Sequence, residues 1–177
     1  DRELVSQELS HRIKNIFSVV SGLISLSARR EPAMRGFADT LRDRVMALGR
    51  AHDFVRPHSD RSRRAVGPAT AFTMLREIFA PYGEAGGERV RIVGDDLAID
   101  ARSAPPLALV FHELATNAAK YGALSTPGGK VLLTGTVDGA DYVMRWAERG
   151  GPMVDGAPAE TGFGSILAQV SVEGQLG

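Results

Sequence analysis

The most informative stretch of this chain is residues 111–125, FHELATNAAKYGALS. If it is helical, Glu113, Asn117 and Lys120 follow one another at spacings of four and three residues and share one face. With Glu113 as the origin, Asn117 falls about 40° to one side and Lys120 about 20° to the other, at 3.6 residues per turn. The sequence therefore predicts a strip that carries a carboxylate, an amide and an ammonium group.

An apolar stripe is expected about 100° away from this strip on the same helix. Its members are Leu107, Val110, Leu114, Ala118 and Tyr121. The polar strip beside it suits a metal–triphosphate site, because Mg²⁺ prefers oxygen ligands such as an amide carbonyl and an ammonium group attracts phosphate. A solvated stripe on an amphipathic helix is the alternative interpretation of the three polar residues alone.

Two further motifs follow in order: residues 146–152, WAERGGP, and residues 162–165, GFGS. Together with residues 111–125 they resemble the ATP-binding domain of histidine kinases and gyrase-type ATPases. The closest resemblance is to the HWE family of histidine kinases, which has a His in the first motif and Trp-x-Glu in the second. The ordered set carries the signal, because Gly-Phe-Gly alone is common.

The resemblance implies roles in binding ATP and Mg²⁺. Asn117 is expected to ligate Mg²⁺, Lys120 to face the phosphates, and Glu113 to orient the nucleophile or accept its proton. Tyr121 is expected to line the adenine pocket, and Glu148 to accept a hydrogen bond from the adenine amino group. The other expected ATP-binding residues are His112, Trp146, Gly150, Gly151, Gly162, Phe163 and Gly164. Packing remains an alternative for His112 and Trp146.

Composition limits the remaining possibilities. The 177 residues are 44% hydrophobic and include no cysteine, which excludes disulfides and thiolate metal sites. The longest apolar stretch, 16–28, is too short to cross a bilayer, and no secretory segment opens the chain, so a cytoplasmic setting is expected.

The charges are unevenly distributed along the chain. Residues 1–64 hold 13 Lys and Arg against eight Asp and Glu, and residues 65–177 hold eight Lys and Arg against 13 Asp and Glu. The first part is therefore expected to meet an acidic partner, and DNA binding is disfavoured because no recognition helix is evident.

The first part of the chain is expected to be a helical hairpin. One apolar seam consists of Leu9, Ile13, Ile16, Val20 and Leu23, and a second of Met34, Phe37, Leu41, Val45, Leu48 and His52. Pro32 is expected to separate the helices. Because a short hairpin cannot bury both seams, we expect a homodimeric four-helix bundle through residues 1–55.

His11 is the expected phospho-acceptor. On a helix it lies opposite the first seam, so its imidazole points outward, as a nucleophile served by a mobile domain requires. Residues 8–15, ELSHRIKN, resemble the phospho-acceptor box of the HWE family. His52 is interpreted as a packed residue, not as a second acceptor.

The second part mixes helix and strand. A helix is expected over 70–82, strands over 89–93 and 97–100, the helix with residues 111–125 behind Pro105 and Pro106, and a β-hairpin from strands 130–137 and 142–147. A helix is also expected over 164–172. This order predicts an α+β fold, with helices on one face of a mixed sheet. The expected domains are the hairpin (1–59), a linker (60–65) and the ATP-binding domain (66–177), with further C-terminal strands and an N-terminal sensor domain absent from this sequence.

The resemblance implies a sensor histidine kinase core. It would transfer a phosphoryl group from MgATP to His11 and then to an aspartate of a response-regulator receiver domain. Two alternatives remain: an ATPase or protein-serine kinase of the same fold, and a nucleotide-binding scaffold without turnover.

Overall fold

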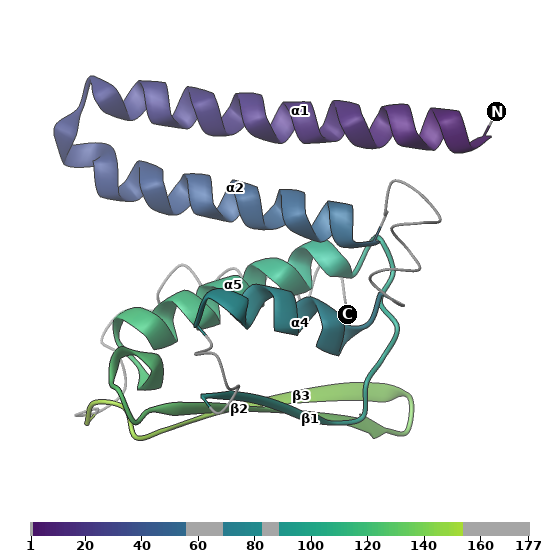
Figure 1. Cartoon of the computed structure of the whole chain (residues 1–177), viewed down its shortest axis with the longest axis vertical. Coiled ribbons are helices and arrows are strands. Elements are labelled where there is room, and N and C mark those ends of the chain that lie inside the picture. Colours follow the sequence, from purple (N-terminus) through teal and green to yellow (C-terminus); the bar gives the residue numbers. More distant parts are fainter. Residues whose placement is uncertain (1, 56–68, 83–88, 154–177) are drawn as a thin grey trace.

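A computed structural model describes residues 2–55, 69–82 and 89–153. Figure 1 shows four layers: the long helix α1, helix α2, the helices α4 and α5, and a β-sheet. The expected α+β fold with helices on one face of a mixed sheet is confirmed. The expected helix over 164–172 lies outside the described residues.

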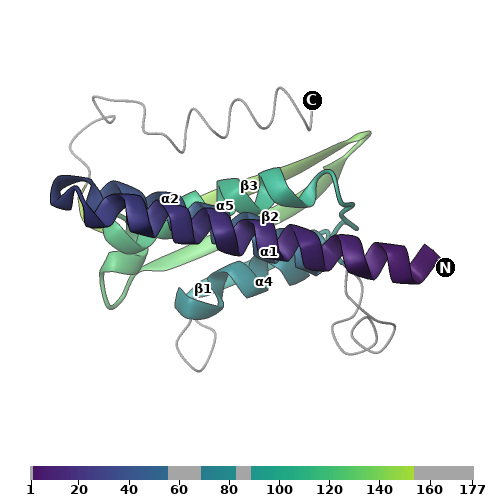
Figure 2. The ribbon, with the colours of Figure 1, turned by 90° about the horizontal axis from the view of Figure 1, so that it is seen from above.

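The hairpin consists of α1 (Arg2–Arg29), a short 3-10 helix η1 (Pro32–Met34) and α2 (Arg35–Val55). The first helix ends before Pro32, as expected. The helices are antiparallel and lie one over the other (Figure 2). Lys14 Nζ lies 2.7 Å from Asp53 Oδ2 near the open end of the hairpin.

The contact between α1 and α2 does not bury the expected seams. The side chains of the hairpin that are buried are small: Ser10, Ser21 and Ala28 on α1 and Ala38 on α2. Ala47 and Ala51 are also buried, on the side of α2 that faces α4 and α5. Ile16, Leu23 and Phe37 are each 59% exposed. Phe17 of α1 packs over Gly49 of α2, while these larger apolar side chains stay on the outer face of the hairpin. This apolar outer face is compatible with the expected four-helix bundle, which the single chain does not itself form.

Helix α4 (Ala71–Phe79) continues into the 3-10 helix η2 (Ala80–Tyr82). Thr70 and Thr73 cap its start reciprocally through their hydroxyl groups. The strand expected over 97–100 is wrong. Ala98 forms only an isolated bridge with Thr70, because the segment pairs with the start of α4 and not with the sheet.

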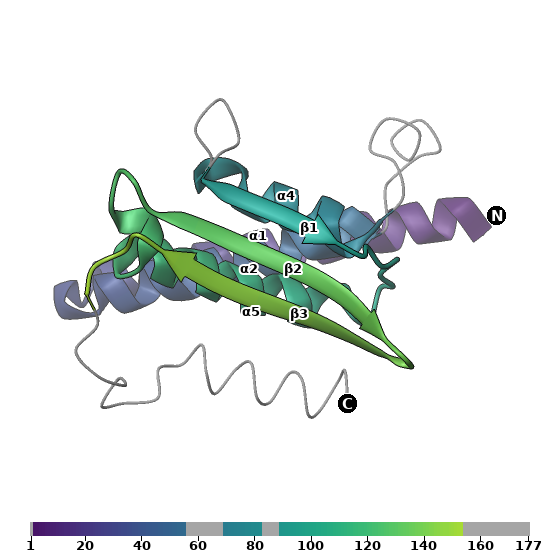
Figure 3. The same cartoon turned by 90° about the horizontal axis from the view of Figure 1, so that it is seen from below.

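The sheet has the order β1-β2-β3, formed by β1 (Val90–Gly94), β2 (Lys130–Asp138) and β3 (Asp141–Arg149). β1 pairs with β2 in parallel, and β2 pairs with β3 as an antiparallel hairpin through a turn at residues 139–140. Figure 3 shows the sheet from below, with the helices behind it. Val131 and Leu133 point from β2 into the core, where they meet Leu75 and Phe111.

Helix α5 (Ala104–Lys120) lies between α2 and the sheet. It begins with Pro105 and Pro106 in its first turn, as expected. Asp100 Oδ1 accepts hydrogen bonds from the amides of Arg102 and Ser103 just before the helix. The bond from the Ser103 amide is the main cause of the lowered pKa of Asp100.

Candidate functional site

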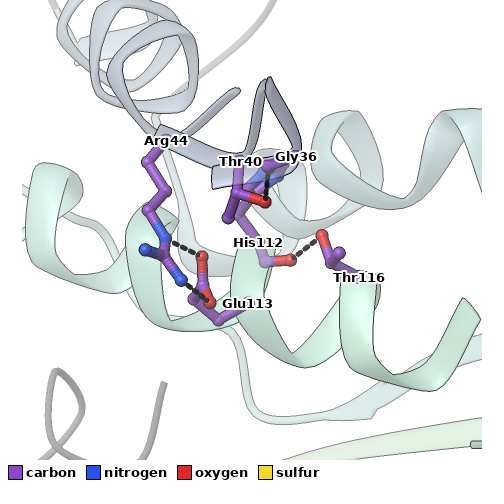
Figure 4. A network of polar contacts seen from close by, with 6 residues as sticks. All are labelled: Gly36, Thr40, Arg44, His112, Glu113 and Thr116. Carbon is purple, nitrogen blue, oxygen red and sulfur yellow. Dashed lines mark hydrogen bonds and ion pairs between the residues drawn. The ribbon is translucent and has the colours of Figure 1, made fainter. Parts of the chain in front are cut away.

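The polar strip of α5 is divided between a covered end and an open end. Asn117 and Lys120 are exposed near the C-terminal end of the helix. Glu113, one turn earlier, is only 8% exposed. Its two carboxylate oxygens accept hydrogen bonds from Nε and Nη2 of Arg44 on α2, at 2.6 and 2.8 Å (Figure 4). The strip therefore offers an amide and an ammonium group to solvent, while its carboxylate is engaged.

Two expectations about the faces of α5 are wrong. Tyr121, assigned to the apolar stripe, is 73% exposed, and Glu113, assigned to the polar strip beside that stripe, is buried. Tyr121 is the residue at which the helix ends, so it lies beyond the covered part. Glu113 is covered because α2 packs on α5 from the side opposite the sheet.

His112 faces α2 and α4. It lines a cavity of about 30 Å³ together with Arg50 of α2 and Glu77 of α4. Burial lowers the pKa of His112, and the nearby Arg50 lowers it further. Burial raises the pKa of Glu77. This position favours the packing interpretation of His112 over direct contact with a ligand at Asn117.

Glu148 joins the end of the β-hairpin to the end of α5. Its Oε2 accepts a hydrogen bond from the amide of Ala123 at 2.6 Å, and its Oε1 accepts one from Nε1 of Trp146 at 2.9 Å. The Trp146 ring packs against Phe79 with centroids 5.5 Å apart, at the edge of the core. The Trp-x-Glu motif thus fixes the turn that follows α5, where Glu148 accepts hydrogen bonds and Trp146 packs against the core.

Glycines allow this turn to pack tightly. A side chain at Gly122 would collide with the Glu148 carboxylate, and one at Gly151 would lie 2.9 Å from the Cα atom of Ala123. Gly151, three residues after Glu148, can therefore approach the end of α5 only because it lacks a side chain. The result is a compact junction between the two motifs beside Asn117 and Lys120.

Arg89 clamps the other side of the junction. Its guanidinium group donates hydrogen bonds to the carbonyl oxygens of Leu124, Thr126 and Gly129. These residues form or follow the 3-10 helix η3 (Ala123–Ser125). One side chain thus fixes the loop that follows the exposed end of the strip.

His11 is exposed on α1, as expected. It lies one turn before Lys14, whose pair with Asp53 places this part of α1 beside the C-terminal end of α2. The structure does not bring His11 together with Asn117 and Lys120. His11 belongs to α1, the outermost helix, and α2 lies between α1 and α5 (Figure 1).

The chemistry of the open end fits MgATP. Asn117 offers an amide oxygen suited to Mg²⁺, and Lys120 offers a cation suited to phosphate. In residues 2–55, 69–82 and 89–153 no group of three or more His, Asp or Glu residues could hold a metal ion. A Mg²⁺ ion there would consequently depend on phosphate oxygens and water for its other ligands. The expected contributions of Gly162, Phe163 and Gly164 lie outside the described residues.

The sequence patterns missed Arg44 and Arg89. Arg44 carried one signal, because it lies three residues after Leu41 and four before Leu48, inside the second apolar stripe. A cation there indicates a buried partner, although the pattern does not name Glu113, 69 residues away. Nothing near Arg89 in the sequence indicated its role.

Comparison with known proteins gives one family match and several relatives. The family model described as "HWE histidine kinase" matches residues 8–96. "Blue-light-activated histidine kinase 1" from Erythrobacter litoralis is 37% identical over 166 residues, which are 92% of this chain and 45% of the relative. A "Blue-light-activated histidine kinase" from Brucella anthropi is 33% identical over 99% of this chain and 35% of the relative. The chain thus spans less than half the length of these relatives.

A solved structure supports the fold. The histidine kinase domain of a blue-light-activated histidine kinase from Erythrobacter litoralis superposes with a TM-score of 0.54 and 16% identity, covering 98% of this chain and 84% of that one. In the part of the chain that the structure describes, no helix has the length and apolar character needed to span a bilayer.

Proposed function

This chain belongs to the HWE histidine kinase family, and we propose that it is the transmitter core of a sensor kinase that phosphorylates its own His11 from MgATP. The phosphoryl group would then pass to an aspartate of a response-regulator receiver domain. The hairpin (1–59) would be the phosphotransfer and dimerisation domain, and residues 66–177 the ATP-binding domain. We further propose that both act in the cytoplasm.

The observation that carries this proposal is the open end of the α5 strip. Asn117 and Lys120 are exposed side by side there, next to the glycine-lined junction of the two ATP-binding motifs. An exposed imidazole on a separate helical module supplies the acceptor that such a site needs. A plain ATPase would give His11 no role.

The residues of the candidate site would divide the tasks of the proposed reaction among them. Asn117 would hold Mg²⁺ through its amide oxygen, and Lys120 would neutralise phosphate charge, while Glu148 and the glycines keep the adenine side of the site in shape. MgATP, when bound, supplies the phosphoryl group. A neutral nitrogen of His11 would form the new N–P bond as the bond to ADP breaks, and a freed Glu113 would orient the imidazole or accept its proton.

The test is incubation with γ-labelled ATP, followed by mapping of the label. We expect an acid-labile, base-stable label on His11, lost in His11→Gln without change in nucleotide affinity. Label on a serine would instead indicate a protein-serine kinase. ATP binding without any label would indicate a scaffold, and ATP hydrolysis without labelling an ATPase.

A further inference from the structure

The contact between Arg44 and Glu113 joins the two modules of the chain. Arg44 belongs to α2 of the hairpin and Glu113 to α5 of the ATP-binding module, 69 residues later. Both nitrogen–oxygen contacts of the pair are short, and the side chains are only 14% and 11% exposed. By contrast, the pair Arg12–Glu8 lies within α1 and its side chains are 72% and 65% exposed. A bidentate, desolvated pair fixes the relative position of two helices far better than an exposed one.

The docked arrangement keeps the ATP-binding strip far from His11. The Lys14–Asp53 pair sets His11 level with the end of α2 near Val55. Val55 is eleven residues beyond Arg44, so His11 lies about 17 Å along the hairpin from the level of Glu113, at 1.5 Å per residue. Phosphoryl transfer needs the reacting atoms within about 3.5 Å.

The direction of α5 increases this separation. Ala104 and Ala108 pack with Ala51 near the end of α2, so α5 runs antiparallel to α2. Asn117 therefore lies about 6 Å farther from His11 than Glu113 does, by the same helical rise. A parallel dimer would place the second copy's His11 at the same level, so transfer between copies meets the same separation.

The pair also occupies the carboxylate that the reaction would use. Both oxygens of Glu113 accept hydrogen bonds from Arg44, and the side chain is only 11% exposed, so the carboxylate is held against α2 and is closed to an incoming imidazole. Figure 4 shows the guanidinium and carboxylate groups facing each other between the two helices. Docking of α5 on α2 therefore has two effects: it keeps the ATP-binding strip away from His11, and it ties up the Glu113 carboxylate.

We infer that the Arg44–Glu113 pair is a latch that holds the ATP-binding module on α2 in a position from which phosphoryl transfer cannot occur. Autophosphorylation requires the latch to open, so that α5 can leave α2 and approach His11. This inference rests on the proposed function and adds the contact that regulates it. A signal that reaches the hairpin would act by changing the fraction of chains in which the latch is open.

The absence of cysteine from the chain allows a direct test. Cysteines introduced at the exposed positions Arg29 and Thr136 carry spin labels on the hairpin and the sheet, and their distance distribution reports docking in the full chain. Arg44→Gln should broaden and lengthen this distribution without nucleotide. It should also raise the rate of His11 labelling by about 5- to 100-fold, the usual range of coupling between two states.

Matched variants separate the latch from catalysis. Arg42→Gln removes a cation two residues away that pairs only locally with Asp39 and Asp43, and it should change neither readout. Glu113→Gln should lengthen the distance but give no gain in labelling. Arg44→Glu combined with Glu113→Arg should restore the short distance, and Arg44→Lys should have an intermediate effect because it loses the bidentate geometry.

Two results would overturn the latch. One is an unchanged distance distribution in Arg44→Gln and in Glu113→Gln, with both variants folded by circular dichroism. The other is a longer distance in Arg44→Gln with His11 labelling lost, which would make the docked state the productive one. If the wild-type chain does not label His11 at all, the proposed function fails, and the distance measurement still decides whether the pair holds the modules together.

Discussion

Asn117 shows how a single exposed side chain can matter for binding and not for folding. We expect Asn117→Ala to lose Mg²⁺-dependent ATP binding, because the change removes the amide oxygen proposed as a metal ligand. Its free energy of unfolding should change by less than about 0.5 kcal/mol, since the side chain is exposed. Calorimetric titration of ATP with and without Mg²⁺ measures the first effect, and thermal unfolding measures the second. Equal ATP affinity in the variant and the wild type would reduce the strip to a solvated surface.

His112 gives the fold a dependence on pH. Because burial lowers its pKa below the ordinary value of 6.5, the unfolded chain binds a proton that the folded chain resists. The contribution of His112 to the free energy of unfolding should therefore be most favourable above pH 6.5. It should become less favourable as the pH decreases below 6.5. His112→Gln should flatten this part of the curve, measured by urea unfolding between pH 5 and 8.

The pH dependence of the free energy of unfolding in the wild type does not by itself give the contribution of His112. Glu77 lines the same cavity, and its raised pKa acts in the opposite direction as the pH rises above 4.5. Asp100 contributes only near and below its ordinary value of 3.8, because its pKa is lowered. The difference between wild type and His112→Gln is the decisive quantity. Parallel curves would mean that His112 is solvated.

At the scale of elements, Arg89 holds the loop after α5. We expect Arg89→Gln to lower the free energy of unfolding by about 1 to 3 kcal/mol, because several backbone carbonyls lose a charged donor. ATP affinity should fall as well, since the loop adjoins Asn117 and Lys120. Arg91→Gln, an exposed change two residues later on β1, is the matched control. A loss of affinity in Arg91→Gln as large as in Arg89→Gln would remove the argument for a specific clamp.

Sequence patterns predict most of the helices and strands but few of the contacts between them. Periodicity identified α4, α5 and the β-hairpin, because each buries the side on which its apolar residues recur. It also identified α1 and α2, although much of their apolar seams stays exposed in the single chain. It placed Glu113 wrongly, since one helix's pattern does not reveal that α2 will cover a second side. It also took 97–100 for a strand, although that segment pairs with the residue before α4. Contacts between distant segments, such as Arg44 with Glu113, leave little trace in local sequence.

For the whole molecule, the zero net charge conceals two modules of opposite sign. The basic hairpin carries the proposed acceptor, and the phosphorylation pocket of a receiver domain is acidic. We expect increasing ionic strength to slow association with the receiver more than it changes dissociation, because charge complementarity mainly raises the association rate. Stopped-flow measurement at several salt concentrations tests this. Association rates that do not change with salt would remove the electrostatic contribution.

The outer face of the hairpin is apolar and exposed in the single chain. Ile16, Leu23 and Phe37 are each 59% exposed, and Leu23 and Phe37 line an apolar groove of about 470 Å³ between α1 and α2. Apolar surface of this kind is typical of an interface. We therefore propose that residues 1–55 form a parallel homodimer, and we expect a dimer by light scattering at tens of micromolar.

Charged substitutions in this seam test the homodimer. Leu23→Glu should weaken it by more than about 100-fold, because the interface would bury an unpaired carboxylate. The folded single chain should tolerate the change, since the side chain is already exposed there. Ser18→Glu, exposed on the opposite side of α1, should leave the dimer intact. A monomeric wild-type chain would contradict the dimer and would require phosphoryl transfer within one chain, which makes opening of the Arg44–Glu113 contact its necessary first step.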